Sequence, residues 1–127
     1  MWLNAIDHIQ VTSSPEAEDA MLFFYSKVLG LTEIPKPETI KANQGGAWYV
    51  LGNIQIHVST EQNPNNAASR RHICYLVNDL QAFQEHLRSH SVEIILDRQP
   101  IPGCDRFFLR DPAGNRIEIA EANSIFS

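Results

Sequence analysis

Four residues with metal-binding side chains fall into two matching pairs along this chain. His8 and His72 each stand near the start of a β-patterned run, whereas His57 and Glu118 each stand in a later one. His57 follows His8 by 49 residues (57 − 8), and Glu118 follows His72 by 46 residues (118 − 72). Three imidazoles and one carboxylate form a ligand set that suits a divalent transition metal. The spacing therefore predicts a duplicated module whose two halves share one metal site.

The alternation of side chains along a strand separates each candidate ligand from the apolar residues beside it. Successive strand residues point to opposite faces, so His57 lies on the face opposite Ile56 and Val58. The same offset holds for the other three candidates. A lone strand histidine is more often a hydrogen-bonded structural residue than a ligand, but four residues at pseudo-symmetric places favour a site. If the apolar faces pack on helices, the four polar side chains point into the concave side of a curled sheet.

The same alternation predicts which other side chains face the candidate site. Residues at even offsets from His8 share its face, and residues at even offsets from Glu118 share that of Glu118 if the last hairpin is regular. The substrate-binding residues predicted in this way are Gln10, Thr12, Arg106 and Phe108. Arg106 would neutralise an anionic substrate or, equally, form an ion pair at the rim. Phe108 would stack on a substrate or fill the cavity.

Four further residues receive weaker interpretations. Cys74 shares the face of His72 and is interpreted as a small buried residue. Trp48 is assigned to neither face. His86 and His90 lie four positions apart on a predicted helix, where this spacing is interpreted as solvated surface.

The bulk composition is that of a globular protein. The chain has 127 residues, of which 43% are hydrophobic, so we expect one domain with its own core. The formal charge of −5 argues against nucleic acid or an anionic membrane as a partner. No apolar run approaches the roughly 20 residues of a membrane helix, and we expect no signal peptide. The two cysteines lack metal or redox spacing, so reduced thiols and a cytoplasmic location are expected.

Hydrophobic periodicity and turn residues divide the chain into two similar halves. We expect a first βαβββ module at about residues 5–60, a polar connector at 61–69 and a second βαβββ module at about 70–122. Ser14, or Ser13 in a capping box with Glu16, is expected to cap the first helix, and the pair Asn78-Asp79 the second. The expected helices are about 15–29 and 80–89, and the expected strands are 7–11, 32–34, about 47–51, 54–59, 71–77, 92–96, 106–109 and 116–120.

Three sequence strings resemble those of one known superfamily. They are Asp-His-Ile at residues 7–9, Phe-Tyr-Ser-Lys-Val-Leu-Gly-Leu at 24–31, and Phe-Phe-Leu-Arg-Asp-Pro-Ala-Gly-Asn-Arg-Ile-Glu at 107–118. With them the chain resembles the vicinal oxygen chelate superfamily, which includes glyoxalase I, bleomycin-resistance proteins, fosfomycin-resistance thiol transferases and extradiol dioxygenases. The resemblance spans residues 7–121 and implies an α+β fold in which two βαβββ modules form a curled mixed sheet around a cavity. Such proteins often have glycine where Ser91 follows the second helix, so we expect a different cap or local strain there.

The resemblance also implies a site and a chemistry. In metal-using members the ligands lie on the first and last strands of each module, which corresponds to His8, His57, His72 and Glu118. The implied cofactor is a divalent metal (Zn, Ni, Co or Fe) that binds two neighbouring oxygens of the substrate. Glu118, as the one anionic ligand, is the implied general base. A small-molecule substrate and a homodimer are the implied partners, with each site shared between modules of two chains.

The resemblance leaves three functions open. A glyoxalase-type lyase or isomerase is favoured, although glyoxalase I has Glu or Gln where His57 stands, and bacterial glyoxalases have a glutathione-binding Arg where Thr12 stands. An Fe(II) extradiol-type dioxygenase would use only His8, His72 and Glu118. A protein that merely sequesters a small molecule would need no metal.

Overall fold

The computed structural model describes residues 1–41 and 45–122 of the chain. It contains two compact units, residues 1–65 and residues 66–127. Each unit is built round one four-stranded mixed sheet, and the two sheets have the same internal order. That the whole chain behaves as a single domain stays a prediction.

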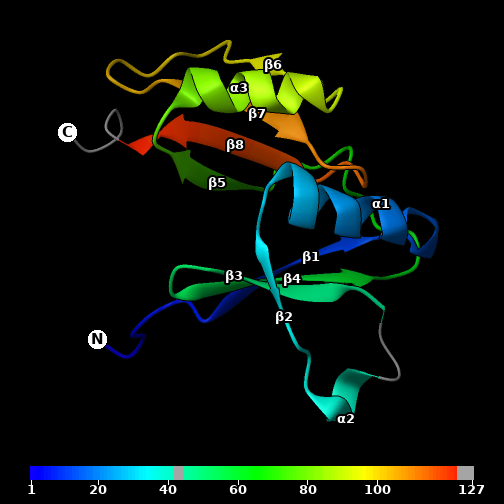
Figure 1. Cartoon of the computed structure of the whole chain (residues 1–127). Coiled ribbons are helices and arrows are strands. Elements are labelled where there is room, and N and C mark those ends of the chain that lie inside the picture. Colours follow the sequence, from blue (N-terminus) through cyan, green and yellow to red (C-terminus); the bar gives the residue numbers. More distant parts are fainter. Residues whose placement is uncertain (42–44, 123–127) are drawn as a thin grey trace. The chain divides into compact units, whose positions relative to one another are not determined.

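The first unit carries the module expected at residues 5–60. Its sheet has the order β1-β4-β3-β2, in which β1 runs parallel to β4 and the other pairs are antiparallel (Figure 1). A helix on one side of the sheet joins β1 to β2. The elements are β1 (His8–Ser13), α1 (Glu18–Phe23), β2 (Thr32–Ile34), α2 (Glu38–Lys41), β3 (Ala47–Leu51) and β4 (Ile54–Thr60).

The second unit repeats this plan, with the sheet order β5-β8-β7-β6 and a parallel β5–β8 pair. Helix α3 lies along the sheet of this unit in Figure 1. The elements are β5 (His72–Val77), α3 (Leu80–Ser89), β6 (Ile95–Leu96), β7 (Arg106–Arg110) and β8 (Arg116–Glu121). The predicted α+β class with two βαβββ modules is therefore confirmed.

The first helical segment differs in detail from the single helix expected at residues 15–29. A 3₁₀ turn at Pro15–Ala17 precedes α1, and a π-helical turn at Phe24–Val28 follows it. Ser14 occupies the N-cap position of the first turn without a side-chain hydrogen bond, and the Ser13 hydroxyl donates to the Ser14 carbonyl oxygen instead. The expected capping hydrogen bond was therefore wrong: the Ser14 side chain makes none, and the Ser13 hydroxyl is bonded to the backbone of Ser14. The short α2 was not predicted.

Both termini of the second helix have the features that the sequence predicted. The Asp79 side chain accepts a hydrogen bond from the Ala82 N–H over 3.0 Å and caps α3. Ser91, just beyond the helix, has a φ of +61°, which confirms the expected strain at a position where glycine is the easier residue. The strand expected at 92–96 is reduced to the two residues of β6.

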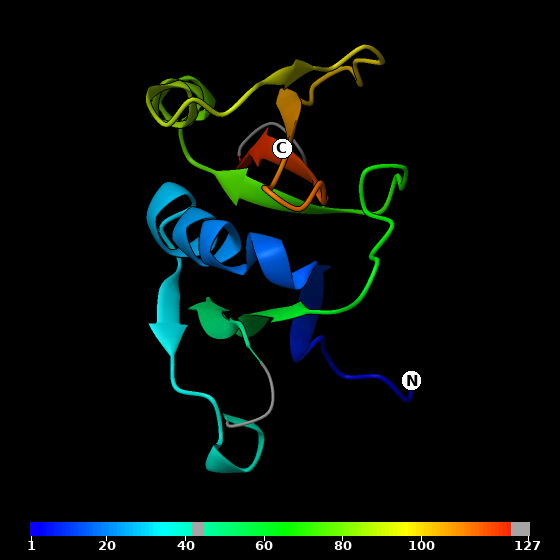
Figure 2. The ribbon, with the colours of Figure 1, turned by 90° about the vertical axis from the view of Figure 1, so that its right-hand side faces the viewer.

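A packed core holds each sheet against its helix. In the first unit Tyr49 of β3 is fully buried, and its hydroxyl donates to the Leu22 carbonyl oxygen of α1 over 3.3 Å. Figure 2 shows α1 along one face of this sheet. The buried apolar residues are Met21, Phe24, Tyr25, Val28, Ala47, Tyr49, Ile56 and Val58 in the first unit and Leu87, Phe107, Phe108, Leu109, Ile117, Ile119 and Ala120 in the second.

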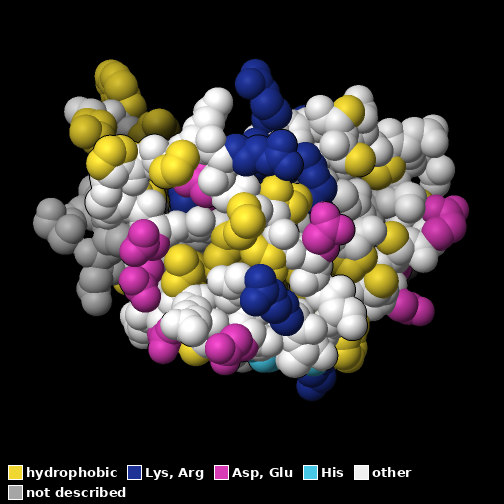
Figure 3. All heavy atoms as spheres, turned by 90° about the horizontal axis from the view of Figure 1, so that it is seen from above, with side chains coloured by type: hydrophobic (Ala, Val, Ile, Leu, Met, Phe, Trp, Pro, Cys, Tyr) yellow, Lys and Arg dark blue, Asp and Glu magenta, His cyan; other side chains and the backbone are white. Residues whose placement is uncertain are grey.

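The surface and the helices give two further observations. Acidic and basic side chains are interspersed on the face seen from above in Figure 3, so this face is not dominated by one sign of charge. Among residues 1–41 and 45–122, no helix has the length and hydropathy needed to span a membrane.

Candidate functional site

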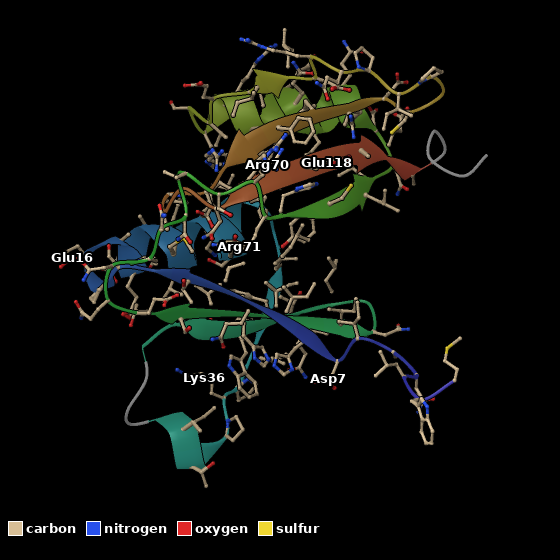
Figure 4. All side chains as sticks on the ribbon, turned by 180° about the vertical axis from the view of Figure 1, so that it is seen from behind. Asp7, Glu16, Lys36, Arg70, Arg71 and Glu118 are labelled. Atoms are coloured by element: carbon tan, nitrogen blue, oxygen red, sulfur yellow. The ribbon has the colours of Figure 1, made fainter. Side chains whose placement is uncertain are left out.

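In the second unit, the parallel β5–β8 pair brings together two of the four candidate ligands. His72 Nε2 lies 3.1 Å from Glu118 Oε1, and Glu118 is buried, with 7% of its surface exposed. Figure 4 labels Glu118 on β8. The contact joins residues 46 positions apart in the sequence. The structure therefore brings His72 and Glu118 together, and their role as metal ligands stays a prediction.

The hydrogen bond on the other side of the His72 ring shows which of its two nitrogens carries a proton. His72 Nδ1 lies 3.0 Å from the Arg70 carbonyl oxygen, and because a carbonyl only accepts, Nδ1 must carry a proton. The opposite nitrogen, Nε2, then faces Glu118 either as a second N–H of an imidazolium or as a bare lone pair. Two lone pairs at this separation repel one another unless a cation lies between them.

This donor set fits a divalent transition metal. A metal-bound histidine characteristically donates its remaining N–H to a carbonyl or carboxylate, as His72 does to Arg70. Two ligand atoms that each lie about 2.1 Å from a metal at right angles are about 3 Å apart, and His72 Nε2 and Glu118 Oε1 are 3.1 Å apart. These two side chains would therefore hold a metal without a large rearrangement of either.

The second oxygen of Glu118 is occupied by an arginine. Arg106 Nη1 donates to Glu118 Oε2 over 3.4 Å, while Arg106 Nε donates to Asp97 Oδ2 over 2.9 Å. Of the two roles considered for Arg106, the ion pair is therefore present in the structure. The prediction missed Asp97, whose side chain reaches this cluster from the loop after β6.

Phe108 faces the same side as Glu118, because the two residues are partners in the β7–β8 pair. The Phe108 side chain is buried, and two guanidinium groups lie against its ring: Arg116 Cζ is 4.3 Å and Arg106 Cζ is 5.3 Å from the ring centroid. The His72 ring lies nearby in a T-shaped arrangement, with 6.1 Å between centroids and an interplanar angle of 78°. The aromatic face thus already binds cations of the chain, and its contact with a substrate stays a prediction.

Cys74 lies opposite Glu118 across the β5–β8 pair. The interpretation of Cys74 as a buried residue was wrong, because the residue is exposed at this edge strand. Desolvation of the thiol by the atoms packed around its sulfur, followed by the nearby Glu118 carboxylate, raises the pKa of Cys74 to about 11. The thiol is therefore protonated at neutral pH and is a poor nucleophile.

In the first unit, His8 and His57 form part of a column of three stacked rings. The His57 and Trp48 rings are 3.8 Å apart with an interplanar angle of 2°, and the His57 and His8 rings are 4.2 Å apart at 14°. Trp48 reaches this place because it is the cross-strand partner of His57 in the β3–β4 pair. Its direction was left open in the sequence interpretation, since it depends on this register.

The ring nitrogens of the stacked pair have different partners. His8 Nδ1 lies 2.9 Å from Asp7 Oδ2, so a proton on Nδ1 would leave Nε2 of His8 as a possible ligand. His57 Nε2 instead lies 2.8 Å from Gln55 Oε1, and the His57 side chain is buried. Burial, and then the charge of His8, lower the pKa of His57 below 6.5, so His57 is neutral at physiological pH.

In the observed rotamers, these contacts prevent His8 and His57 from binding the same metal ion. A metal lies in the plane of each imidazole that binds it, whereas the two parallel rings present their faces to one another. His57 would have to leave both Trp48 and Gln55 in order to share an ion with His8. Over the described residues, 1–41 and 45–122, no three His, Cys, Asp or Glu side chains are gathered into one cation site.

The two remaining predicted site residues lie on β1. Gln10 is exposed and is the partner of His57 in the parallel β1–β4 pair, which places both on one face as predicted. The Thr12 hydroxyl donates to a carboxylate oxygen of Glu61, beyond the end of β4. Their contact with a substrate stays a prediction.

Comparison with known proteins is consistent with this fold and these strands. Residues 5–119 match the sequence profile of the glyoxalase/bleomycin resistance protein/dioxygenase superfamily. The chain belongs to this superfamily.

Three relatives illustrate how far the likeness extends. A glyoxalase family protein from Bacillus anthracis is 39% identical, with a TM-score of 0.85 over 95% of this chain and 97% of that chain. Glyoxylase I 4 from Arabidopsis thaliana is 26% identical, over 98% of this chain and 75% of that protein. Lactoylglutathione lyase from Agrobacterium tumefaciens covers 100% of both chains with a TM-score of 0.74 and 19% identity, and so shows the fold alone.

Proposed function

We propose that this member of the superfamily is a divalent-metal-dependent lyase or isomerase of glyoxalase type. The proposal rests chiefly on the second unit, where a histidine with a defined Nδ1 proton presents Nε2 to a buried carboxylate at 3.1 Å. The name of the Arabidopsis relative, glyoxylase I, supports the reaction class. The proposed ligands are His8, His57, His72 and Glu118, and the proposed metal is Zn, Ni, Co or Fe.

The proposed chemistry moves a proton between neighbouring carbons of a small oxygen-rich substrate. A divalent metal, when bound, would stabilise negative charge on two adjacent substrate oxygens. Glu118 would take the proton from the hydroxyl-bearing carbon beside a substrate carbonyl and return it to the former carbonyl carbon, while the hydroxyl proton passes to the former carbonyl oxygen. Each carboxylate oxygen has two acceptor sites, so Glu118 Oε2 can take this proton beside its 3.4 Å hydrogen bond from Arg106 Nη1. Gln10 and Thr12 would contact the substrate from β1.

The first substrate to test is the hemithioacetal of methylglyoxal and glutathione, followed by 2-hydroxycarbonyl compounds without glutathione. We expect the metal-loaded protein to isomerise at least one of them, and Glu118→Gln to lower kcat by about 10²–10⁴-fold, as for the loss of a general base. Glu93→Gln removes the same charge from an exposed residue and should change kcat little. Equal rates for Glu118→Gln and the wild type would contradict the assignment of the base.

The stacking of His57 supports a second candidate, an Fe(II) extradiol-type dioxygenase. If His57 keeps its contacts with Trp48 and Gln55, the remaining ligands are His8, His72 and Glu118, which form the two-histidine, one-carboxylate set of non-haem iron oxygenases. Oxygen uptake by the iron-loaded protein in the presence of a catechol, unaffected by His57→Ala, would favour this candidate over the first.

We further propose a homodimer in which each site takes His8 and His57 from one chain and His72 and Glu118 from the other. Mixing His8→Ala and His72→Ala chains would then leave one intact ligand set in each mixed dimer. With random exchange, half of the dimers are mixed, so we expect about one quarter of the wild-type metal content after mixing. Mixtures that bind no more metal than the separate variants would contradict the shared site.

A further inference from the structure

The arginine that contacts Glu118 is itself held by three acceptors in a short loop. Besides the bond from Nε to Asp97 Oδ2, Arg106 Nη2 donates to the Gln99 carbonyl oxygen over 3.1 Å and lies 3.5 Å from Asp97 Oδ1. The side chains of Arg106, Asp97 and Glu118 are all largely buried, with exposed fractions of 14%, 11% and 10%. The guanidinium therefore has a defined orientation relative to Glu118.

The loop in turn fixes the orientation of Asp97. Asp97 directly follows β6, and its Oδ1 accepts a hydrogen bond from the Gln99 N–H over 3.0 Å, so the carboxylate is part of a turn. The hydrogen bond from Arg106 holds the pKa of Asp97 below its ordinary value, and Asp97 is therefore charged at neutral pH. The negative charge of Asp97 compensates the positive charge of Arg106.

This arrangement restricts what Glu118 offers to a ligand. Arg106 occupies Oε2, so Oε1, beside His72 Nε2, is the oxygen left for an ion. We propose that Asp97 and Arg106 are positioning residues that make Glu118 a one-oxygen metal ligand. The inference rests on the proposed function, because it assumes that a metal binds His72 and Glu118.

Asp97 is the residue whose removal gives the clearest expectation. Without Asp97, Arg106 would lose its orientation and would also keep a full positive charge beside Glu118. Both changes weaken the binding of a cation, whereas removing Arg106 itself would lose orientation but also remove repulsion. Partners of metal ligands typically contribute 10–100-fold to metal affinity. A comparable contribution is expected from Asp97.

The test uses Co²⁺ as the probe, with the affinity measured by competition with a chromophoric chelator and the coordination followed by the visible absorption of bound Co²⁺. We expect Asp97→Asn to bind Co²⁺ about 10–100-fold more weakly than the wild type and to change the Co²⁺ spectrum. Glu93→Gln, which removes the same charge from an exposed residue of the same unit, should bind like the wild type. Wild-type affinity and spectrum in Asp97→Asn would overturn the inference while the proposed metal site stands.

A second pair of variants separates positioning from a merely structural effect. In an Arg106→Met background, Asp97→Asn should no longer weaken Co²⁺ binding, because Asp97 acts through the guanidinium. An undiminished loss in that background would overturn the inference. Arg106→Lys keeps the charge but lacks the planar fork, so it should also weaken binding. A wild-type protein that binds no Co²⁺ would overturn both this inference and the proposed function.

Discussion

His72→Ala is expected to reduce the affinity of the protein for Zn²⁺ or Co²⁺ by more than the 10–100-fold typical of an outer-shell partner, since it removes a ligand atom itself. The substitution also leaves the Glu118 carboxylate without its 3.1 Å neighbour, while the hydrogen bond from Arg106 to Oε2 remains. The fold should be retained, because His72 is exposed at the first position of β5. Metal affinity and the urea midpoint, measured on the same samples, check both statements.

His86→Ala is the matched control for this prediction. His86 is an exposed histidine of the same unit, on α3, and is no part of the proposed site. We expect its removal to leave metal affinity within about twofold of the wild type, because the altered side chain lies outside the ligands and their partners. A loss in His86→Ala as large as that in His72→Ala would show that the bound metal lies on the helix surface instead.

Gly46→Ala is expected to destabilise the first unit by about 3 kcal/mol or more. Gly46 has a φ of +93°, and a Cβ atom at this position would lie 1.9 Å from the Val58 carbonyl oxygen and 2.8 Å from its carbonyl carbon. Both are backbone atoms of β4, so relief of the overlap requires the sheet to shift. Because Gly46 directly precedes β3, such a shift would also displace Trp48 from His57.

Gly52→Ala separates the close approach from the cost of the backbone conformation. Gly52 also has a positive φ, +59°, but a Cβ atom built there has no neighbour within 4 Å. Its replacement should cost only the strain of the left-handed conformation, about 1 kcal/mol. Urea unfolding of the two variants gives the comparison, and equal losses of stability would contradict the role assigned to the Val58 contact.

The sequence predicted the parts of the site that depend on strand alternation. The faces of Gln10 and Phe108 follow from the two-residue period of a strand, and the structure confirms them through the β1–β4 and β7–β8 pairs. The approach of His72 to Glu118 follows in the same way, once the first and last strands of a module are neighbours. Alternation also predicts which side chains share a face without predicting what they contact.

The remaining features depend on contacts that no short pattern encodes. Asp97 lies in a loop after a two-residue strand, so its approach to Arg106 is set by the tertiary fold and has no periodicity to reveal it. The side of the sheet taken by Trp48 depends on the register of β3 with β4. The stacking of His57 between Trp48 and His8 is a choice of rotamer, which the type of residue alone leaves open.

The central claim, that the chain binds a catalytic divalent metal, is tested most directly by elemental mass spectrometry of the protein after reconstitution, with His57→Ala alongside. We predict about one Zn, Ni or Co per chain in the wild type, as for a site of this ligand type, and less in the variant. Iron retained by both proteins would instead support the dioxygenase candidate. No metal in the wild type, even after reconstitution, would contradict the claim and leave a protein that only binds a small molecule.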